Sequence, residues 1–212
     1  LVIVVHLSGH CADMEKIYLL KKKYKFKIIE DACHGLGGKY HESKIGSCKY
    51  SDISTFSFHP VKSITTGEGG MITTNNKDLY EKLKIYRSHG IIKSKKLFKN
   101  KKVAFEKSKV VNRWYYEVQN IGYNYRMTDI QASLGVTQME RADLILGERQ
   151  SLAGNYDKTL NEQNFFQLPF RHHDYIHGYQ SYPTVFDIKN VNINSIPDLN
   201  KKRNTFMEAL QS

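Results

Sequence analysis

The sequence predicts an α/β protein with a mainly parallel sheet flanked by helices. Short apolar segments typical of strands alternate with helical patterns in the first half of the chain, which favours strand–helix–strand units. Polar and reactive side chains follow directly after two of these segments, and ligand sites in open α/β sheets lie at the carboxyl ends of the strands. The 212 residues are 40% hydrophobic and 25% charged, a composition typical of a folded domain with room for a core.

Apolar runs and capping residues place the elements along the chain. A strand is expected at 1–7, a helix at 12–24 with Asp13 as its N-cap, and a strand at 26–30. Further strands are expected at 53–58 and 70–74, and a helix at about 76–89 capped by Asn76 or Asp78. Thr128 is a good N-cap for a long helix that continues towards Leu160. We also expect a strand at about 181–188 and a helix at 204–212.

One stretch, residues 53–70, carries the strongest chemical signal. An apolar, β-prone run from Ile53 to Phe58 ends at His59-Pro60, where the chain must leave the sheet because proline has no N–H to donate. Lys62 follows just beyond the carboxyl end of that strand, before a Gly-Glu-Gly-Gly turn. A lysine at this position could hold a carbonyl cofactor, although a lysine after a proline is commonly a solvated loop residue.

A second stretch upstream supplies a carboxylate. The short apolar strand that begins at Lys27 ends in Glu30-Asp31, and a glycine-rich segment follows. Alone, Asp31 is readily explained as a helix cap or a turn residue. Together with Lys62, it forms the pair that pyridoxal phosphate needs: a lysine for the Schiff base and an acid for the pyridinium nitrogen.

The motifs that carry a family resemblance occur in a fixed order. They are Glu-Asp-Ala-Cys-His-Gly-Leu-Gly-Gly at 30–38, Phe-Ser-Phe-His-Pro-Val-Lys at 56–62, Gly-Glu-Gly-Gly at 67–70, Arg-Ser-His-Gly at 87–90 and Gly-Tyr-Asn-Tyr-Arg-Met at 122–127. The chain resembles the DegT/DnrJ/EryC1/StrS family of pyridoxal-phosphate-dependent nucleotide-sugar aminotransferases. Within that family it is most similar to enzymes that aminate C4 of a UDP-linked 4-keto-6-deoxy sugar on the route to pseudaminic acid. The resemblance covers most of residues 1–160 and thins to Gln-Ser-Tyr at 180–182.

The resemblance implies a role for five residues. Lys62 would form the Schiff base and shuttle a proton, and Asp31 would pair with the pyridine nitrogen. His34 would hydrogen-bond the 3′-oxygen of the cofactor, although it could be a satisfied structural histidine. Ser57 would bind the cofactor phosphate, or face packing instead. Asn124 would reach the phosphate in the neighbouring subunit, which implies a homodimer with shared sites; the alternative is a turn asparagine in a left-handed conformation.

The family fold is fold type I of the pyridoxal-phosphate enzymes, and the resemblance divides the chain into two parts. Residues 1–150 would be the C-terminal part of the cofactor-binding large domain, and residues 151–212 an incomplete small α+β domain entered through a long helix. We expect a chain truncated at both ends, because it opens on a strand without an initiator methionine. The family's glycine-threonine phosphate loop and stacking aromatic residue have no counterpart here, so this chain alone is not expected to bind the cofactor securely.

The implied reaction moves an amino group from an amino acid, L-glutamate, to the keto carbon of a nucleotide-linked sugar for surface-glycan synthesis. A pyridoxamine-dependent sugar dehydratase is a rival with the same fold, but that class carries histidine in place of Lys62. A catalytically impaired or regulatory relative that keeps the fold is a second rival, disfavoured by Lys62, Asp31 and Ser57 together.

The net charge, the cysteines and the apolar runs indicate whether the chain binds nucleic acid, holds a metal or disulfides, or spans a membrane. The net charge of +11 raises nucleic-acid binding as an alternative. However, the lysines gather at the end of the first helix and in the run 93–109, which is expected to be a mobile loop, and no nucleic-acid fold signature is present. The three cysteines, Cys11, Cys33 and Cys48, have no metal-ligand spacing, so we expect no metal and no disulfide framework. No apolar run is long enough to span a membrane, and a cytoplasmic protein is expected.

Overall fold

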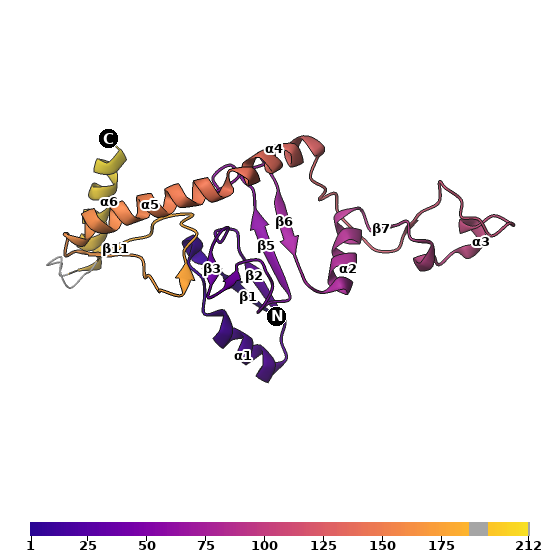
Figure 1. The fold of residues 1–212 in the computed structure, drawn as a ribbon, viewed down its shortest axis with the longest axis horizontal. Helices are drawn as coiled ribbons and strands as arrows, with labels where there is room; N and C mark the ends of the chain where they lie inside the picture. Colours follow the sequence, from indigo (N-terminus) through magenta and orange to yellow (C-terminus); the bar gives the residue numbers. More distant parts are fainter. Residues whose placement is uncertain (187–194, 212) are drawn as a thin grey trace.

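The central sheet has four strands and is mixed. In the computed structural model, which describes residues 1–186 and 195–211, the strand order is β1 (Val2–Val5), β2 (Ile28–Asp31), β5 (Ile53–Ser57) and β6 (Gly70–Thr73) (Figure 1). β1, β2 and β5 are parallel, and β6 runs antiparallel to β5. All four strands lie where the sequence predicts them, so the α/β class with a mainly parallel sheet is confirmed.

Helices and short strands complete the fold. The helices are α1 (Met14–Tyr24), α2 (Lys77–Arg87), α3 (Lys101–Ala104), α4 (Asp129–Glu140), α5 (Ala142–Asn161) and α6 (Ile196–Gln211), with 3-10 turns at Leu7–Gly9 and Lys95–Leu97. The two-residue strands are β3 (Lys39–Tyr40), β4 (Ser43–Lys44), β7 (Ile91–Ile92), β8 (Glu117–Val118), β9 (Phe166–Gln167), β10 (Tyr175–Ile176) and β11 (Val185–Phe186). They pair as β10-β3-β4, β11-β9 and β7-β8. The strand predicted at about 181–188 is therefore found at 185–186, and residues 187 and 188 lie outside the described residues.

The predicted helix starts are confirmed by their capping hydrogen bonds. The Asp13 side chain accepts from the Lys16 amide at 3.2 Å, and Asn76, rather than Asp78, caps α2 by accepting from the Leu79 amide at 3.0 Å. Thr128 forms a full capping box with Gln131 at the start of α4. Each cap satisfies amide groups that have no partner within their helix.

Two sequence expectations need correction. The long helix predicted from Thr128 is two helices, because α4 ends and α5 begins around Arg141, whose φ of −98° and ψ of −1° depart from regular helix. The lysine-rich run 93–109 was expected to be a loop with few apolar anchors, but it contains α3, and its Phe98 and Ala104 form a small apolar cluster with Ile92. Figure 1 shows this excursion projecting away from the sheet beyond α2. These few apolar residues lie among many lysines, so the sequence pattern does not indicate an apolar cluster.

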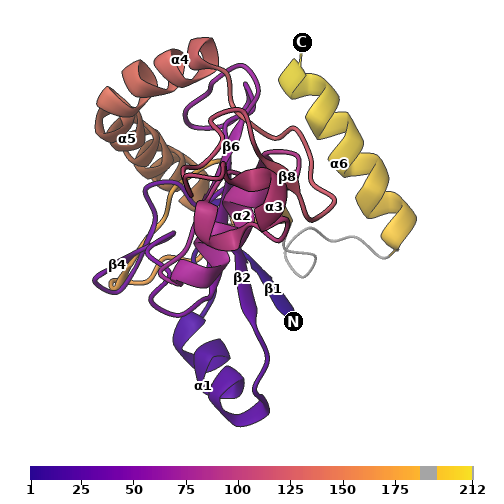
Figure 2. The same ribbon diagram turned by 90° about the vertical axis from the view of Figure 1, so that its right-hand side faces the viewer.

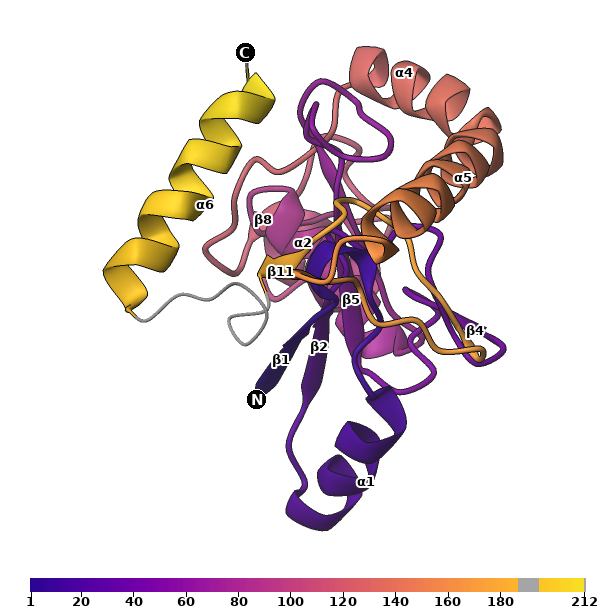
Figure 3. The ribbon, with the colours of Figure 1, turned by 90° about the vertical axis from the view of Figure 1, so that its left-hand side faces the viewer.

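Helices cover one face of the sheet. Val4 and Ile28 pack with Met14 of α1 in one apolar cluster, and Phe56 packs with Ala142 of α5 in another. The same arrangement is visible in Figures 2 and 3, where α1, α4 and α5 lie on one side of the sheet. On the other face, which carries alternate residues of the same strands, Ile3 is 59% exposed and Ile72 is 50% exposed. The open face is the one that carries Asp31.

Two carboxylates, one at each end of the sheet, connect neighbouring segments through hydrogen bonds and ion pairs. At the carboxyl end, His6 Nε2 lies 3.0 Å from the Glu30 carboxylate, and Ser51 donates to the same carboxylate. At the amino end, Asp52 accepts from the Ile28 amide at 2.9 Å and from Lys21 Nζ at 2.7 Å. No helix in the described parts of the chain is long and apolar enough to cross a membrane.

Asp52 gives the fold a testable dependence on pH. Burial raises the pKa of this carboxyl, but hydrogen bonds from Lys21, Lys27 and the Ile28 amide lower it by more, so its pKa lies below the ordinary value. Because the folded pKa is below the unfolded one, the stability that Asp52 contributes is present above about pH 4 and is lost as the pH falls through the folded pKa. We expect Asp52→Asn to lower the free energy of unfolding by about 1–3 kcal/mol at neutral pH.

Urea denaturation at a series of pH values measures this effect. The difference between the wild-type chain and Asp52→Asn should shrink as the pH falls from about 5 to 3. Glu140→Gln, which removes an exposed carboxylate from α4, is the control and should change stability little at any pH. A difference for Asp52→Asn that does not vary with pH would contradict the assignment.

Candidate active site

Asp31 is the last residue of β2 and is half-buried on the open face of the sheet. Its Oδ1 accepts a hydrogen bond from the Cys33 amide at 3.1 Å. Burial raises the pKa of Asp31, but hydrogen bonds from Cys33 and electrostatic interactions with His34 and Lys62 lower it by more. The net shift is downward, so this carboxylate is ionised at neutral pH.

Lys62 lies in a tight loop that leaves the sheet after β5. The Phe58 amide donates to the Gly69 carbonyl at 2.9 Å and the Thr66 amide donates to the Phe58 carbonyl at 3.0 Å, which closes the loop at its base. Within it, the Lys62 amide donates to the His59 carbonyl at 2.9 Å. The Lys62 side chain is half-buried, and its charge acts on the carboxyl of Asp31 and the imidazole of His34. Lys62 is therefore not a freely solvated loop residue.

His34 completes the group of Asp31, His34 and Lys62. Its Nδ1 accepts a hydrogen bond from the Ser8 amide at 3.3 Å. Ser8 has the left-handed φ of 60°, a conformation uncommon for a residue other than glycine. Burial and the charge of Lys62 lower the pKa of His34, and Asp31 opposes them only in part. Because Nδ1 accepts, the neutral ring carries its proton on Nε2 and can donate it to a ligand oxygen.

The structure does not bring Ser57 and Asn124 into contact with this group. Ser57 shares the open face with Asp31, but its Oγ accepts from the His59 amide at 3.3 Å and helps shape the start of the loop. Asn124 is exposed, in a segment whose backbone pairs with Ser88 at the end of α2. Its predicted role requires a second subunit and stays a prediction.

Gln180 is a residue whose role sequence reasoning missed. Its Oε1 accepts from the Ser63 amide at 3.1 Å, and its Nε2 donates to the Val61 carbonyl at 2.7 Å. One side-chain amide thus bridges the residues on either side of Lys62, and Arg149 of α5 donates to the Gln180 carbonyl at 3.3 Å. The weak Gln-Ser-Tyr match at 180–182 was the one signal in the sequence that pointed here.

Other residues near the motifs have no catalytic task assigned to them. Burial and the neighbouring Asp31 raise the pKa of the Cys33 thiol to about 11, so Cys33 is not a nucleophile at neutral pH. Burial lowers the pKa of His177 to about 4, and its Nδ1 accepts from the Tyr179 amide at 2.8 Å. Arg87 and His89 lie apart from Lys62 and line a cavity at the end of α2.

The donor set fits pyridoxal phosphate. An ionised carboxylate can hold a protonated pyridine nitrogen, a primary amine can bond to an aldehyde carbon, and a neutral imidazole can donate to a ring oxygen. All three groups gather at the carboxyl end of the parallel strands, and the sheet face beside them is open.

The protein family of this chain follows from a comparison of its sequence with family profiles. The sequence profile of the DegT/DnrJ/EryC1/StrS aminotransferase family matches residues 1–208. The chain belongs to this family. The family predicted from the motifs is thus confirmed.

Two similar proteins are named as aminotransferases of sugar biosynthesis. The UDP-4-amino-4,6-dideoxy-N-acetyl-beta-L-altrosamine transaminase of Campylobacter jejuni serotype O:23/36 is 39% identical over 163 residues, which cover 77% of this chain and 38% of that protein. PseC of Helicobacter pylori, an aminotransferase involved in the biosynthesis of pseudoaminic acid, superposes with a TM-score of 0.76 at 29% identity, over 94% of this chain and 49% of PseC. The chain thus spans about half of the length of PseC, and less than half of the length of the Campylobacter transaminase.

A third comparison bears on the cofactor. The protein Spr1654 of Streptococcus pneumoniae, solved in its PLP form, superposes with a TM-score of 0.72 at 25% identity, over 88% of this chain and 47% of Spr1654. Together with the family match, it confirms pyridoxal phosphate as the cofactor of this family and fold type I as the fold class.

The bridge from Gln180 to the Lys62 loop is testable without cofactor. We expect Gln180→Ala to make the Ser63 amide exchange with deuterium about five times faster, because one net hydrogen bond is worth about 1 kcal/mol. Gln180→Glu keeps the acceptor for Ser63 and loses only the donor to Val61, so its effect on Ser63 should be smaller. Hydrogen-exchange NMR of residues 61–66 measures both, with the exposed Gln167→Ala as control. Equal exchange in Gln180→Ala and the wild-type chain would contradict the bridge.

Proposed function

We propose that the protein containing this chain is a pyridoxal-phosphate-dependent aminotransferase. It transfers an amino group from an amino acid, L-glutamate, to the C4 keto carbon of a nucleotide-linked deoxy sugar for surface-polysaccharide or glycan synthesis. The observation that carries the proposal is the convergence of Asp31, His34 and Lys62 at the carboxyl ends of β2 and β5, in a chain of this family. The transaminase and PseC matches support the sugar substrate and the choice of C4.

Each residue of the group has a distinct task. Pyridoxal phosphate supplies an electron sink for the carbon next to the transferred nitrogen. Lys62 Nζ would hold the cofactor aldehyde and would move a proton to and from that carbon. Asp31 keeps a proton on the pyridine nitrogen, because its own lowered pKa favours the charged pair. His34 orients the ring through its Nε2–H, and Ser57 is proposed to hold the phosphate.

A cationic cavity supports a diphosphate-bearing substrate. A hollow of about 540 Å³ at the end of α2 is lined by Lys84, Arg87, Lys93 and Arg126, with one acidic residue, Glu81. Arginine and lysine side chains in such a cleft attract phosphate oxygens and concentrate an anionic ligand. The diphosphate of a nucleotide sugar has this chemistry.

A homodimer with shared sites is the proposed assembly. The segment that carries Asn124 is held against α2, where the Tyr125 amide donates to the Arg87 carbonyl at 3.0 Å. It presents Ile121, 89% exposed, beside the stacked and exposed rings of Tyr123 and Tyr125. Exposed apolar and aromatic side chains grouped in this way are typical of a protein interface.

The two-part organisation and the location of the reaction are also proposals. Residues 1–150 would form the C-terminal part of the cofactor-binding domain, and residues 151–212 the beginning of the small domain. We propose a reducing cytoplasm, with which the three free cysteines agree.

Chemical trapping tests the role of Lys62. In the protein containing residues 1–212, borohydride reduction after incubation with pyridoxal phosphate should add one pyridoxyl group to the peptide that carries Lys62. Lys62→Ala should lose this label, and Lys49→Ala, an exposed lysine on another loop, should keep it. Asp31→Asn should still be labelled, but L-glutamate added before the reduction should abolish labelling about 10²-fold or more slowly than in the wild-type protein. A label on a different lysine, or no label, would contradict the proposed function.

Subunit mixing tests the role of Asn124. Lys62→Ala and Asn124→Ala homodimers should each be nearly inactive in amination of a UDP-linked 4-keto sugar. If a site combines Lys62 of one subunit with Asn124 of the other, unfolding and refolding the two variants together should restore about a quarter of wild-type activity, because half of the dimers then hold one intact site. Absence of any recovery would count against a shared site.

A further inference from the structure

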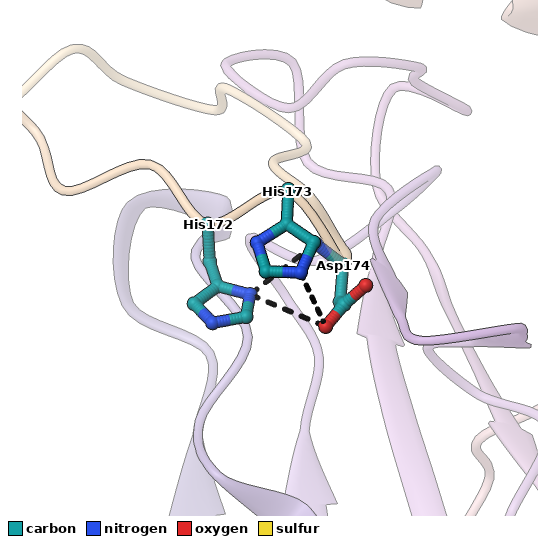
Figure 4. A group of neighbouring side chains, drawn as sticks. All are labelled: His172, His173 and Asp174. Atoms are coloured by element: carbon teal, nitrogen blue, oxygen red, sulfur yellow. Dashed lines mark hydrogen bonds and ion pairs between the residues drawn. The ribbon is translucent and has the colours of Figure 1, made fainter.

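A cluster of imidazole and carboxylate groups lies outside the active site, on the small sheet formed by β10, β3 and β4. His172, His173 and Asp174 are consecutive and immediately precede β10, and their potential ligand atoms all lie within 4.8 Å of one another. In Figure 4 the nearest nitrogens of both rings face the same carboxylate oxygen. The antiparallel register pairs Tyr175 with Tyr40, so residue 174 falls opposite His41 of the β3–β4 turn.

One atom, Asp174 Oδ2, is the centre of the cluster. It lies 3.1 Å from His173 Nε2, 3.7 Å from His172 Nδ1 and 3.8 Å from His41 Nδ1. His41 is not one of the three residues whose ligand atoms lie mutually within 4.8 Å, so it approaches the carboxylate separately. The ring of His172 is stacked on Tyr175 at 4.6 Å, which fixes its orientation.

The spacing of the contacts to Asp174 Oδ2 can be compared with that of a metal site. Among the described residues, none of the three contacts to Asp174 Oδ2 has the direction of a hydrogen bond, although one is only 3.1 Å long. In a tetrahedral zinc site with bonds of about 2.0–2.1 Å, neighbouring ligand atoms lie roughly 3.4 Å apart. The distances from Asp174 Oδ2 to the nitrogens of His173 and His172 bracket this value, and His41 Nδ1 would have to move closer to complete the shell.

We propose that His172, His173 and Asp174, with His41 as a fourth ligand, form a site for a first-row divalent transition metal, with zinc as the reference ion. Imidazole nitrogens with one carboxylate suit zinc, nickel and copper, whereas calcium and magnesium take oxygen ligands. The bound metal would link the segment before β10 to the β3–β4 turn, which meet through strands of only two residues each.

The side chains around the cluster do not block a metal ion from binding there. The adjacent cation, Arg171, forms an ion pair with Asp157 and lies over the ring of Tyr179 at 5.4 Å. His172 Nδ1 accepts a hydrogen bond from the Asp174 amide at 3.2 Å, which a metal at this nitrogen must displace. The side chains of His173 and Asp174 are exposed enough for an ion to enter from solvent.

Zinc titration of the tag-free chain, stripped with a chelator, tests the proposal by calorimetry. We expect one site per chain with a dissociation constant in the micromolar range, and a zinc-dependent rise in Tm because the ion binds the folded chain. Asp174→Asn and His173→Ala should each weaken binding at least roughly tenfold, and His41→Ala by less. His59→Ala is the matched control, since His59 Nε2 lies 3.9 Å from a single carboxylate, that of Glu68.

The outcomes separate a metal site from a surface cluster of histidines. Weaker zinc binding in both Asp174→Asn and His173→Ala, with His59→Ala unchanged, supports the site. Zinc binding that survives both substitutions, or that is absent below millimolar zinc in the wild-type chain, overturns it. Because Asp174 and His173 are on the surface, circular dichroism of each variant should match the wild-type spectrum, and hydrogen exchange at Tyr175 and Tyr40 should slow only when zinc is bound.

Discussion

The active-site geometry depends on the parallel register between β2 and β5. Ile29 pairs with Ile53 and Asp31 with Thr55, so both strands end at the same edge of the sheet. The Lys62 loop begins immediately beyond that edge and is closed by backbone hydrogen bonds at its base. A slip of one residue would turn the side chain of Asp31 to the covered face and away from Lys62. The pairing is therefore as much a part of the site as the side chains are.

Strand alternation also explains why two adjacent carboxylates have different roles. Glu30 points to the face covered by α1, where it is 5% exposed and its carboxylate is held by His6 and Ser51. Asp31, one residue later, points to the open face, where interactions with His34 and Lys62 lower its pKa. A buried charge is tolerated only with partners of this kind. Glu30 thus stabilises the end of the strand, while Asp31 remains available to a ligand.

Local patterns in the sequence were enough to predict the central strands and the caps at Asp13 and Thr128. They also placed Asp31 and Lys62 at or just beyond the ends of two neighbouring strands. Those features depend on alternation, on the chemistry of short side chains and on where proline stops a strand. The break at Arg141 was not predictable, because neither glycine nor proline marks it. The Gln180 bridge could not be derived either, since Gln180 and Ser63 are 117 residues apart in the sequence and meet only through tertiary packing.

The segment after α5 is more than a link to a second domain. Tyr175 pairs with Tyr40 in a small sheet, the Gly178 amide donates to the Gly9 carbonyl at 2.9 Å, and Gln180 bridges the Lys62 loop. Three attachments within six residues fix this segment to the first part of the chain. The proposed domain boundary near residue 150 therefore does not divide the packing around Lys62. Because the loop that holds Lys62 is supported by Gln180, which lies beyond that boundary, the conformation of the loop depends on both parts of the chain.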